Sequence, residues 1–230
     1  MLEKLKKNVY EANMMLPEAG LVSLTWGNAS GFDKEKKLVV IKPSGVNYKD
    51  LSPENMVVLD LEGNIIEGKL RPSSDTPTHL ILYKNFKNIG GIVHTHSTWA
   101  TIWAQALKSI PCLGTTHADH FYKEIPCARF LTKKETEEGY ERNTGNVILE
   151  TFIHRDHLST PGVLLAGHAP FTWGKDSKDA VKNSIILEEI AKMAYGTFIL
   201  NPNAKNLPEH IMNKHYYRKH GENAYYGQDN

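Results

Sequence analysis

The sequence lacks the features of several large classes of protein. It has only two cysteines, Cys112 and Cys127, outside any Cys-x-x-Cys pair, which excludes a small disulfide-rich secreted scaffold. No stretch of about 18 apolar residues could form a transmembrane helix, and residues 1–7 lack the apolar core of a signal peptide. We therefore expect a cytoplasmic protein with no membrane partner.

An excess of charge of either sign is also missing. The 27 lysines and arginines nearly balance 26 aspartates and glutamates, which argues against a polybasic nucleic-acid partner. What is present is a 230-residue chain that is 40% hydrophobic, enough for one core, and 11 histidines. We predict a single domain over residues 1–230.

Hydrophobic periodicity and turn residues predict the elements of this domain. The segment 133–152 is ambiguous, with a helix favoured, and residues 62–64 predict a hairpin turn. Strands outnumber βαβ alternations, which favours a mixed, largely antiparallel sheet covered by helices. The predicted helices span 2–16, 77–87, 98–107, 177–200 and 208–221, and the predicted strands span 21–26, 38–41, 56–61, 64–66, 90–96, 162–166 and 171–173.

Three histidines at predicted strand ends form a candidate metal site. His94 and His96 are separated by one residue, so both imidazoles project from the same side of a strand and one ion can bind both. His168 lies in a Gly-His-x-Pro turn after another strand and offers a third ligand. The alternative is that His94 and His96 are ordinary half-exposed sheet residues. Asp75 is a candidate fourth ligand, and its alternative role is helix capping.

Three turn-like segments combine small residues with hydrogen-bond donors. They are residues 26–30, 42–45 and 72–75, and none matches a P-loop or dinucleotide fingerprint. Backbone N–H groups and serine hydroxyls in such turns can bind an oxyanion, and Lys42 supplies a positive charge. Taken singly, each segment also fits an ordinary turn.

Motifs along most of the chain resemble one enzyme family. The sequence is similar to the L-ribulose-5-phosphate 4-epimerases of the class II aldolase and adducin-like superfamily. The resemblance implies a three-layer αβα fold, a bound Zn²⁺ for which Mn²⁺ or Co²⁺ can substitute, and a homotetramer. The matching motifs are Trp-Gly-Asn at 26–28, Ile-Lys-Pro-Ser-Gly at 41–45, Pro-Ser-Ser-Asp-Thr-Pro-Thr-His at 72–79, Val-His-Thr-His-Ser at 93–97, Gly-Thr-Thr-His-Ala-Asp at 114–119, Tyr-Tyr-Arg-Lys-His-Gly at 216–221 and Ala-Tyr-Tyr-Gly-Gln at 224–228.

The resemblance also implies roles for individual residues. His94, His96 and His168 match the metal ligands, with Asp75 as the associated carboxylate, and Asp119 and Tyr226 match the acid/base pair. Residues 208–230 would complete the site of a neighbouring subunit, to which Tyr226 would contribute while Asp119 stays with its own zinc. The positions that match substrate and phosphate contacts are Gly27, Asn28, Lys42, Ser44, Gly45, Ser73 and Ser74, together with His215 and Arg218 from that neighbour.

The chemistry of a 4-epimerase explains why such residues are needed. C4 of a 2-ketopentose lies β to the carbonyl and bears no acidic hydrogen, so inversion requires cleavage of C3–C4, rotation of the aldehyde and re-addition. A divalent ion stabilises the enediolate formed on cleavage, and two proton carriers serve the two faces of the aldehyde. The pathway, arabinose or ascorbate catabolism, stays open.

Two alternatives come from the same superfamily. One is an aldolase that cleaves a sugar phosphate such as fuculose 1-phosphate, whose family has glutamate where this chain has Asp75. The other is a non-catalytic adducin-like module without a usable metal site, against which the three histidines argue. Asp75, Asp119 and the Tyr-Tyr-Gly-Gln tail favour the epimerase, an isomerase.

Overall fold

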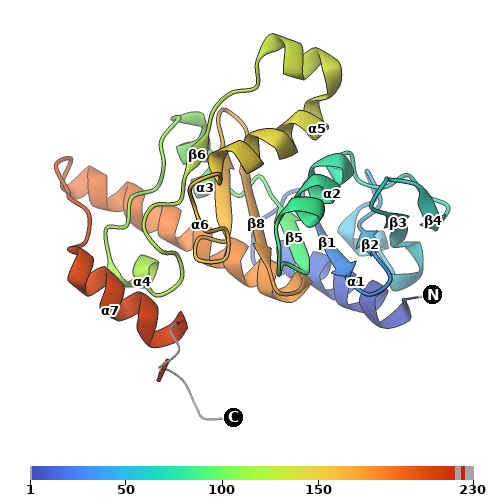
Figure 1. The fold of residues 1–230 in the computed structure, drawn as a ribbon, viewed down its shortest axis with the longest axis horizontal. Coiled ribbons are helices and arrows are strands. Elements are labelled where there is room, and N and C mark those ends of the chain that lie inside the picture. The colour runs from blue at the N-terminus through green and yellow to red at the C-terminus, as the bar shows by residue number, and fades with distance from the viewer. Residues whose placement is uncertain (1, 221–223, 226–230) are drawn as a thin grey trace.

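The protein is built on one eight-stranded sheet. The computed structural model describes residues 2–220 and 224–225, and its strands follow the order β4-β3-β2-β1-β5-β8-β7-β6 (Figure 1). Every neighbouring pair is antiparallel except β6 with β7. The predicted, largely antiparallel sheet is therefore confirmed. The strands are β1 (Asn28–Asp33), β2 (Leu38–Ile41), β3 (Val57–Asp60), β4 (Ile65–Glu67), β5 (Gly91–His94), β6 (Cys127–Ala128), β7 (Gly162–Leu165) and β8 (Pro170–Gly174).

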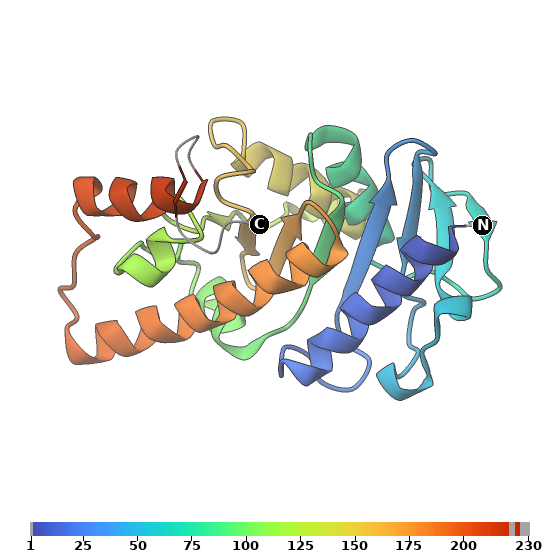
Figure 2. The same ribbon diagram turned by 90° about the horizontal axis from the view of Figure 1, so that it is seen from below.

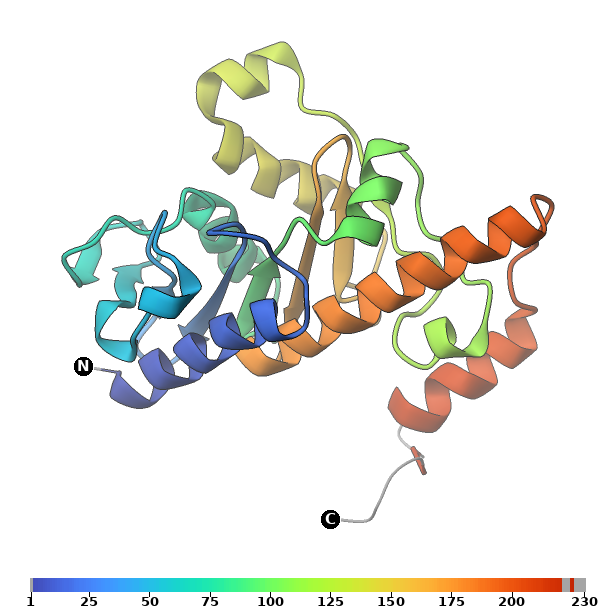
Figure 3. The same ribbon diagram turned by 180° about the vertical axis from the view of Figure 1, so that it is seen from behind.

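Helices cover both faces of this sheet, as the three-layer prediction requires. One layer contains α1 (Glu3–Glu18), α3 (Thr98–Gln105) and α6 (Ser177–Leu200), and the other contains α2 (Thr76–Asn85) and α5 (Lys133–Thr151) (Figures 1 and 3). The short elements are two 3₁₀ turns, Tyr48–Asp50 and Pro53–Asn55, and helix α4 (Thr115–Ala118); α7 (Glu209–His220) packs on α4 (Figure 2). None of the helices in the described ranges is long and apolar enough to cross a membrane.

Alternating side chains on the central strands fill a core on each face. Val39 and Ile92 pack with the α2 and α5 layer, whereas Val40 and Val93 pack with α1 and the start of α6. All four are buried, because a strand with helices on both sides has no polar face. The sequences of β2 and β5 are therefore short, largely apolar runs without polar alternation.

The predicted strand at 21–26 is wrong. Residues 21–27 form a loop, and the strand is the following small-residue segment Asn28–Asp33, which the sequence suggested as a turn. A Cβ atom on Gly31 would lie 2.7 Å from a methyl group of Val9, so α1 packs directly on the backbone of β1. The small residues allow this close approach, whereas Leu24 is 76% exposed with a φ of 54°.

Most other predictions agree with the structure to within a few residues. The hairpin joins β3 to β4, and the ambiguous segment is helix α5, broken at Gly139. The cap of α6 is Asp176, whose side chain accepts from the Asp179 N–H at 2.9 Å. Gly221, the predicted end of α7, lies outside the described residues.

Candidate metal centre and active site

A cavity of about 560 Å³ opens where β1 and β5 meet the loops after β2 and before α2. It gathers every predicted metal and phosphate residue except His215 and Arg218. The three turn-like segments at 26–30, 42–45 and 72–75 therefore meet the three histidines in one cavity. The cavity is lined by Thr25, Trp26, Gly27, Asn28, Lys42, Pro43, Ser44, Gly45, Ser73, Ser74, Asp75, His94, His96, Tyr140, Glu141 and His168.

The three predicted histidines form a nearly equilateral triangle. His94 ends β5, His96 follows two residues later, and His168 lies in the turn between β7 and β8. The ring centroids are 5.0 Å apart for His94 and His96 and 4.9 Å apart for the other two pairs. Because β1 and β8 flank β5 at His94, the sheet holds this imidazole from both sides.

The protonation of these imidazoles suits a divalent metal. His94 Nδ1 lies 3.0 Å from the carbonyl oxygen of Pro170, which can only accept, so Nδ1 donates to it and Nε2 is the nitrogen left for a metal. Burial, aided by the neighbouring histidines, lowers the pKa of His168 to about 4, and burial also lowers the pKa of His96. One nitrogen from each ring lies within 4.8 Å of the others. Three imidazoles in this arrangement fit an ion such as Zn²⁺.

Asp75 faces the same cavity beside the histidines. It stands at the N-cap of α2 but makes no side-chain capping bond, and its Oδ2 instead accepts from Asn28 Nδ2 at 2.6 Å. Burial alone would raise its pKa, but His94, His79 and the Asn28 amide outweigh burial and hold the pKa below its usual value. The carboxylate is therefore ionised and is not used as a helix cap. Its role as a direct ligand stays a prediction.

Lys42 brings a buried positive charge to the cavity wall. Its side chain is 2% exposed, and Nζ donates to the carbonyl oxygens of Thr25 and Pro43, at 3.3 and 3.5 Å. Nζ also lies 4.9 Å from the ring centroid of Tyr48. Within residues 2–220 and 224–225 no ion pair involves this ammonium, and burial lowers its pKa to about 8. Such a charge favours an anionic ligand.

The loop that contains Gly27 packs closely against the backbone at the end of β5. Gly27 has a φ of 74°, and a Cβ there would lie 2.9 Å from the His94 carbonyl oxygen, so this position requires glycine. Asn28 donates from Nδ2 to Ser73 Oγ at 3.0 Å, and its buried Oδ1 has no partner among the described residues. Asn28 therefore joins two of the predicted donor loops.

Comparison with known proteins places this arrangement in a family. The sequence model of the Class II Aldolase and Adducin N-terminal domain matches residues 7–195. The chain belongs to the class II aldolase and adducin family.

Solved structures agree with this assignment to the class II aldolases. An L-fuculose 1-phosphate aldolase is 26% identical, with a TM-score of 0.74 over 94% of this chain and 95% of that chain. YgbL from Klebsiella pneumoniae is 20% identical, with a TM-score of 0.74 over 93% of this chain and 99% of that one. The L-fuculose-1-phosphate aldolase of Thermus thermophilus is 23% identical, with a TM-score of 0.68 over 89% of this chain and 99% of that one. The last two comparisons concern the fold alone.

Three further predicted residues, Asp119, His215 and Arg218, form a separate cluster. Asp119 follows α4 and accepts from Arg218 Nη2 at 2.8 Å, with His215 Nδ1 3.1 Å from its other oxygen. Although burial opposes ionisation, these bonds and the nearby Lys219 charge hold the pKa of Asp119 below its usual value. Asp119 does not line the histidine cavity.

The predicted assignment of Asp119 to its own metal, and of Arg218 and His215 to a neighbouring subunit's site, stays a prediction. All three meet in one chain, because α7 packs on α4. Tyr226 lies outside the described residues, but the preceding Tyr225 donates its N–H to the Arg218 carbonyl oxygen at 3.0 Å. The described part of the tail thus returns to the Asp119 cluster of its own chain.

Tyr140 and Glu141 also line the cavity and were not predicted from the sequence. Tyr140 and Glu141 follow Gly139 in α5, and the Tyr140 hydroxyl lies 3.4 Å from His168 Nδ1. Their signal in the sequence is the glycine inside a helical segment, which can mark a break where side chains turn toward a site.

Proposed function

We propose that this protein is an L-ribulose-5-phosphate 4-epimerase, an isomerase that interconverts L-ribulose 5-phosphate and D-xylulose 5-phosphate in the cytoplasm. The observation that carries this proposal is the shared cavity of two complementary groups. Three imidazoles suited to a metal line this cavity together with the Lys42 ammonium, which has no ion-pair partner among the described residues. A phosphorylated sugar with a chelating end is the kind of ligand that satisfies both.

The reaction explains why one cavity would need both a metal site and a phosphate site. When the C4 hydroxyl loses its proton, the C3–C4 bond breaks into glycolaldehyde phosphate and the enediolate of dihydroxyacetone. Rotation of the aldehyde before C3–C4 forms again inverts C4. His94, His96 and His168 would hold a divalent ion, which would supply Lewis-acid stabilisation of the negative charge, and zinc suits this donor set.

The residues around Lys42 hold the other fragment. Lys42 binds the phosphate as a positive charge, and the turns of Gly27, Ser44 and Ser73 add N–H and hydroxyl donors. Because the aldehyde is detached during the reaction, these contacts keep it near the nucleophilic carbon. The same contacts distinguish an epimerase from an aldolase, which releases its aldehyde.

Asp119 and Tyr226 are the proposed proton carriers, supplied by a neighbouring copy in a homotetramer. Asp119 contacts Arg218 and His215 of its own chain, away from its own histidine cavity. We therefore assign the Asp119 cluster and the tail together to the neighbour's site. This assignment places the metal ligands on one chain and the acid/base pair on the other.

The test is turnover of L-ribulose 5-phosphate with detection of D-xylulose 5-phosphate. His96→Asn is the inactive control, and unphosphorylated L-ribulose tests the Lys42 subsite. A second assay offers fuculose 1-phosphate and measures free aldehyde. Release of aldehyde without epimerisation would replace the epimerase by an aldolase, and turnover of L-ribulose as fast as of its phosphate would remove the phosphate role of Lys42.

A further inference from the structure

Helix α5 consists of two pieces that meet at the edge of the histidine cavity. Gly139 has φ 145° and ψ 94°, which are not helical, so residues 133–138 and 140–151 form separate helical pieces. Tyr140 and Glu141, the first residues after the break, line the cavity. The angle between the two pieces therefore decides where the Tyr140 hydroxyl lies.

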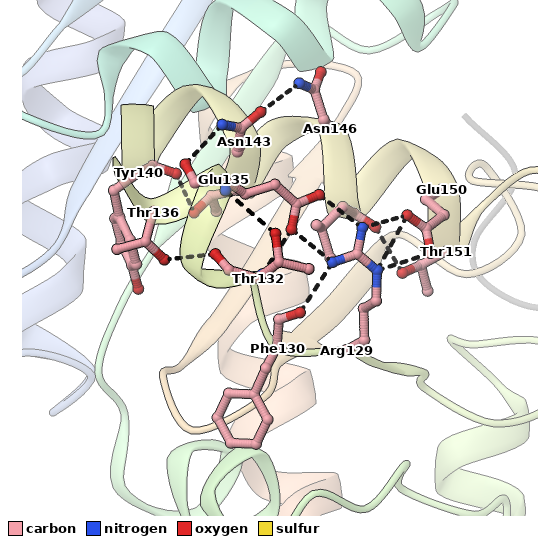
Figure 4. Close-up of polar contacts among 12 residues, drawn as sticks. Arg129, Phe130, Thr132, Glu135, Thr136, Tyr140, Asn143, Asn146, Glu150 and Thr151 are labelled. Atoms are coloured by element: carbon pink, nitrogen blue, oxygen red, sulfur yellow. Dashed lines mark hydrogen bonds and ion pairs between the residues drawn. The ribbon is translucent and has the colours of Figure 1, made fainter. Parts of the chain in front are cut away.

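Arg129 joins the two pieces from outside the helix (Figure 4). Its guanidinium donates to Glu135 from Nη1 and Nη2 at 2.8 and 2.9 Å, and to Glu150 from Nε and Nη2 at 3.0 and 2.7 Å. Nη1 also donates to the Phe130 carbonyl oxygen at 3.0 Å. All five N–H donors of the arginine are thus used, and its planar fork bridges a carboxylate on each side of Gly139.

Glu135 is itself fixed on the first piece. It forms a capping box with Thr132, whose N–H donates to Glu135 Oε2 at 2.7 Å, and Arg129 lowers the pKa of Glu135 to about 2. A second tie crosses the break, because Asn143 Nδ2 donates to the Glu135 carbonyl oxygen at 2.7 Å (Figure 4). Several bonds therefore hold the kink at Gly139, and the ion pairs among them are those of Arg129 with Glu135 and Glu150.

The segment that carries Arg129 also contacts the turn of His168. A Cβ on Gly167 would lie 2.6 Å from the Phe130 ring, so this ring packs directly on the backbone next to His168. Residues 129 and 130 thus contact both the helix that carries Tyr140 and the turn that carries the third imidazole. Tyr140 and His168 meet between them, with the hydroxyl 3.4 Å from Nδ1.

We propose that Arg129 is a positioning residue for the metal centre. By bridging Glu135 and Glu150 across Gly139, it holds the Tyr140 hydroxyl at Nδ1 of His168 and so orients the nitrogen that faces the cavity. A partner on the second nitrogen of a ligating histidine fixes the tautomer and direction of the ring. This inference rests on the metal site of the proposed function but assigns a role to Arg129, which is not among the residues that line the cavity.

The test compares Zn²⁺ affinity, measured by competition with a chromophoric chelator, among single and double variants. We expect Arg129→Gln and Tyr140→Phe each to weaken Zn²⁺ binding about tenfold, within the range for lost outer contacts of metal ligands. Because they act through one contact, the double variant should be no weaker than either single variant. Glu135→Gln, which keeps a residue suited to the capping box, should match Arg129→Gln.

Arg155→Gln is the matched control. Arg155 pairs with Glu124 at 2.7 Å, and its side chain is 38% exposed against 41% for Arg129. This control should bind Zn²⁺ within twofold of the wild type. Wild-type affinity in Arg129→Gln, or a hundredfold loss in the double variant, would overturn the proposal.

Hydrogen exchange of the metal-free protein tests the clamp without the metal. Amides of residues 136–144 should exchange at least tenfold faster in Arg129→Gln than in Arg155→Gln. Unchanged exchange there would overturn the role of Arg129 even if the wild type bound no Zn²⁺. Absence of Zn²⁺ binding by the wild type would instead refute the proposed metal centre.

Discussion

Replacing Lys42 by methionine should stabilise the ligand-free protein while removing its affinity for phosphate. The side chain is 2% exposed, forms no ion pair in the described part of the chain, and has its pKa lowered from 10.5 to about 8. This lowering means that folding disfavours the charged form of Lys42, relative to the neutral form, by about 3 kcal/mol. Lys42→Met removes that penalty and keeps the length of the side chain.

The expected gain is smaller than the full penalty. The variant also loses the contact of the ammonium with the Tyr48 ring, worth about 0.5–2 kcal/mol, and leaves the Thr25 carbonyl oxygen without this donor. We expect a net gain of about 1–2 kcal/mol, or about 2–8 °C in Tm for a chain of this size at neutral pH. Thermal unfolding with and without inorganic phosphate measures both effects, and phosphate should raise the Tm of the wild type only.

The sign of the pH dependence follows from the lowered pKa. Between about pH 8 and 10.5 the unfolded chain binds more protons at Lys42 than the folded chain, so wild-type stability rises over this interval relative to the variant. The full penalty is present below pH 8. Lys123→Met is the control, because Lys123 also lies over a tyrosine ring, at 5.5 Å from that of Tyr122, but is exposed. A less stable Lys42→Met protein, with a difference from wild type that does not change with pH, would refute the reasoning.

Three further experiments test other parts of the molecule. His96→Asn should lose bound metal and epimerase activity together, as measured by elemental analysis and turnover, and an active metal-free variant would contradict the proposed mechanism. Asp119→Asn and Tyr226→Phe should fail to restore activity when their subunits are mixed, whereas His96→Asn mixed with Tyr226→Phe should regain it; restored activity in the first mixture would return Asp119 to its own metal. Gly31→Ala should lower the free energy of unfolding by about 1–3 kcal/mol, because its Cβ would meet the side chains of Val9 and Leu5 at 2.7 and 2.9 Å. Gly114→Ala, which has open space around it, is the neutral control in chemical denaturation.

Local patterns in the sequence predicted the part of the site that depends on local geometry. The His-x-His spacing at 94 and 96 places two imidazoles together even though His96 lies beyond the end of β5. Gly27 and Gly45 were predicted as turn residues, and both have positive φ. In each case the required information lies within a few neighbouring residues.

Features set by packing were not predictable in this way. The strand Asn28–Asp33 is defined by α1 packing on Gly31, whereas alternating apolar residues earlier in the chain predicted a strand that does not form. The partners of Asp119 lie 96 and 99 positions away in the sequence, and its contacts with His215 and Arg218 exist only because α7 folds back on α4. Tyr140 reaches the cavity because of the break at Gly139, which composition alone does not orient.

The pairing of His94 with Phe171 across β5 and β8 has a kinetic consequence. It joins segments separated by more than 70 residues, so the third imidazole reaches the other two only after a large loop of chain has closed. Partly folded forms that lack this pairing contain only the local His94 and His96 pair. An ion that bridges all three rings therefore stabilises the finished sheet, slowing unfolding while leaving the rate of folding nearly unchanged.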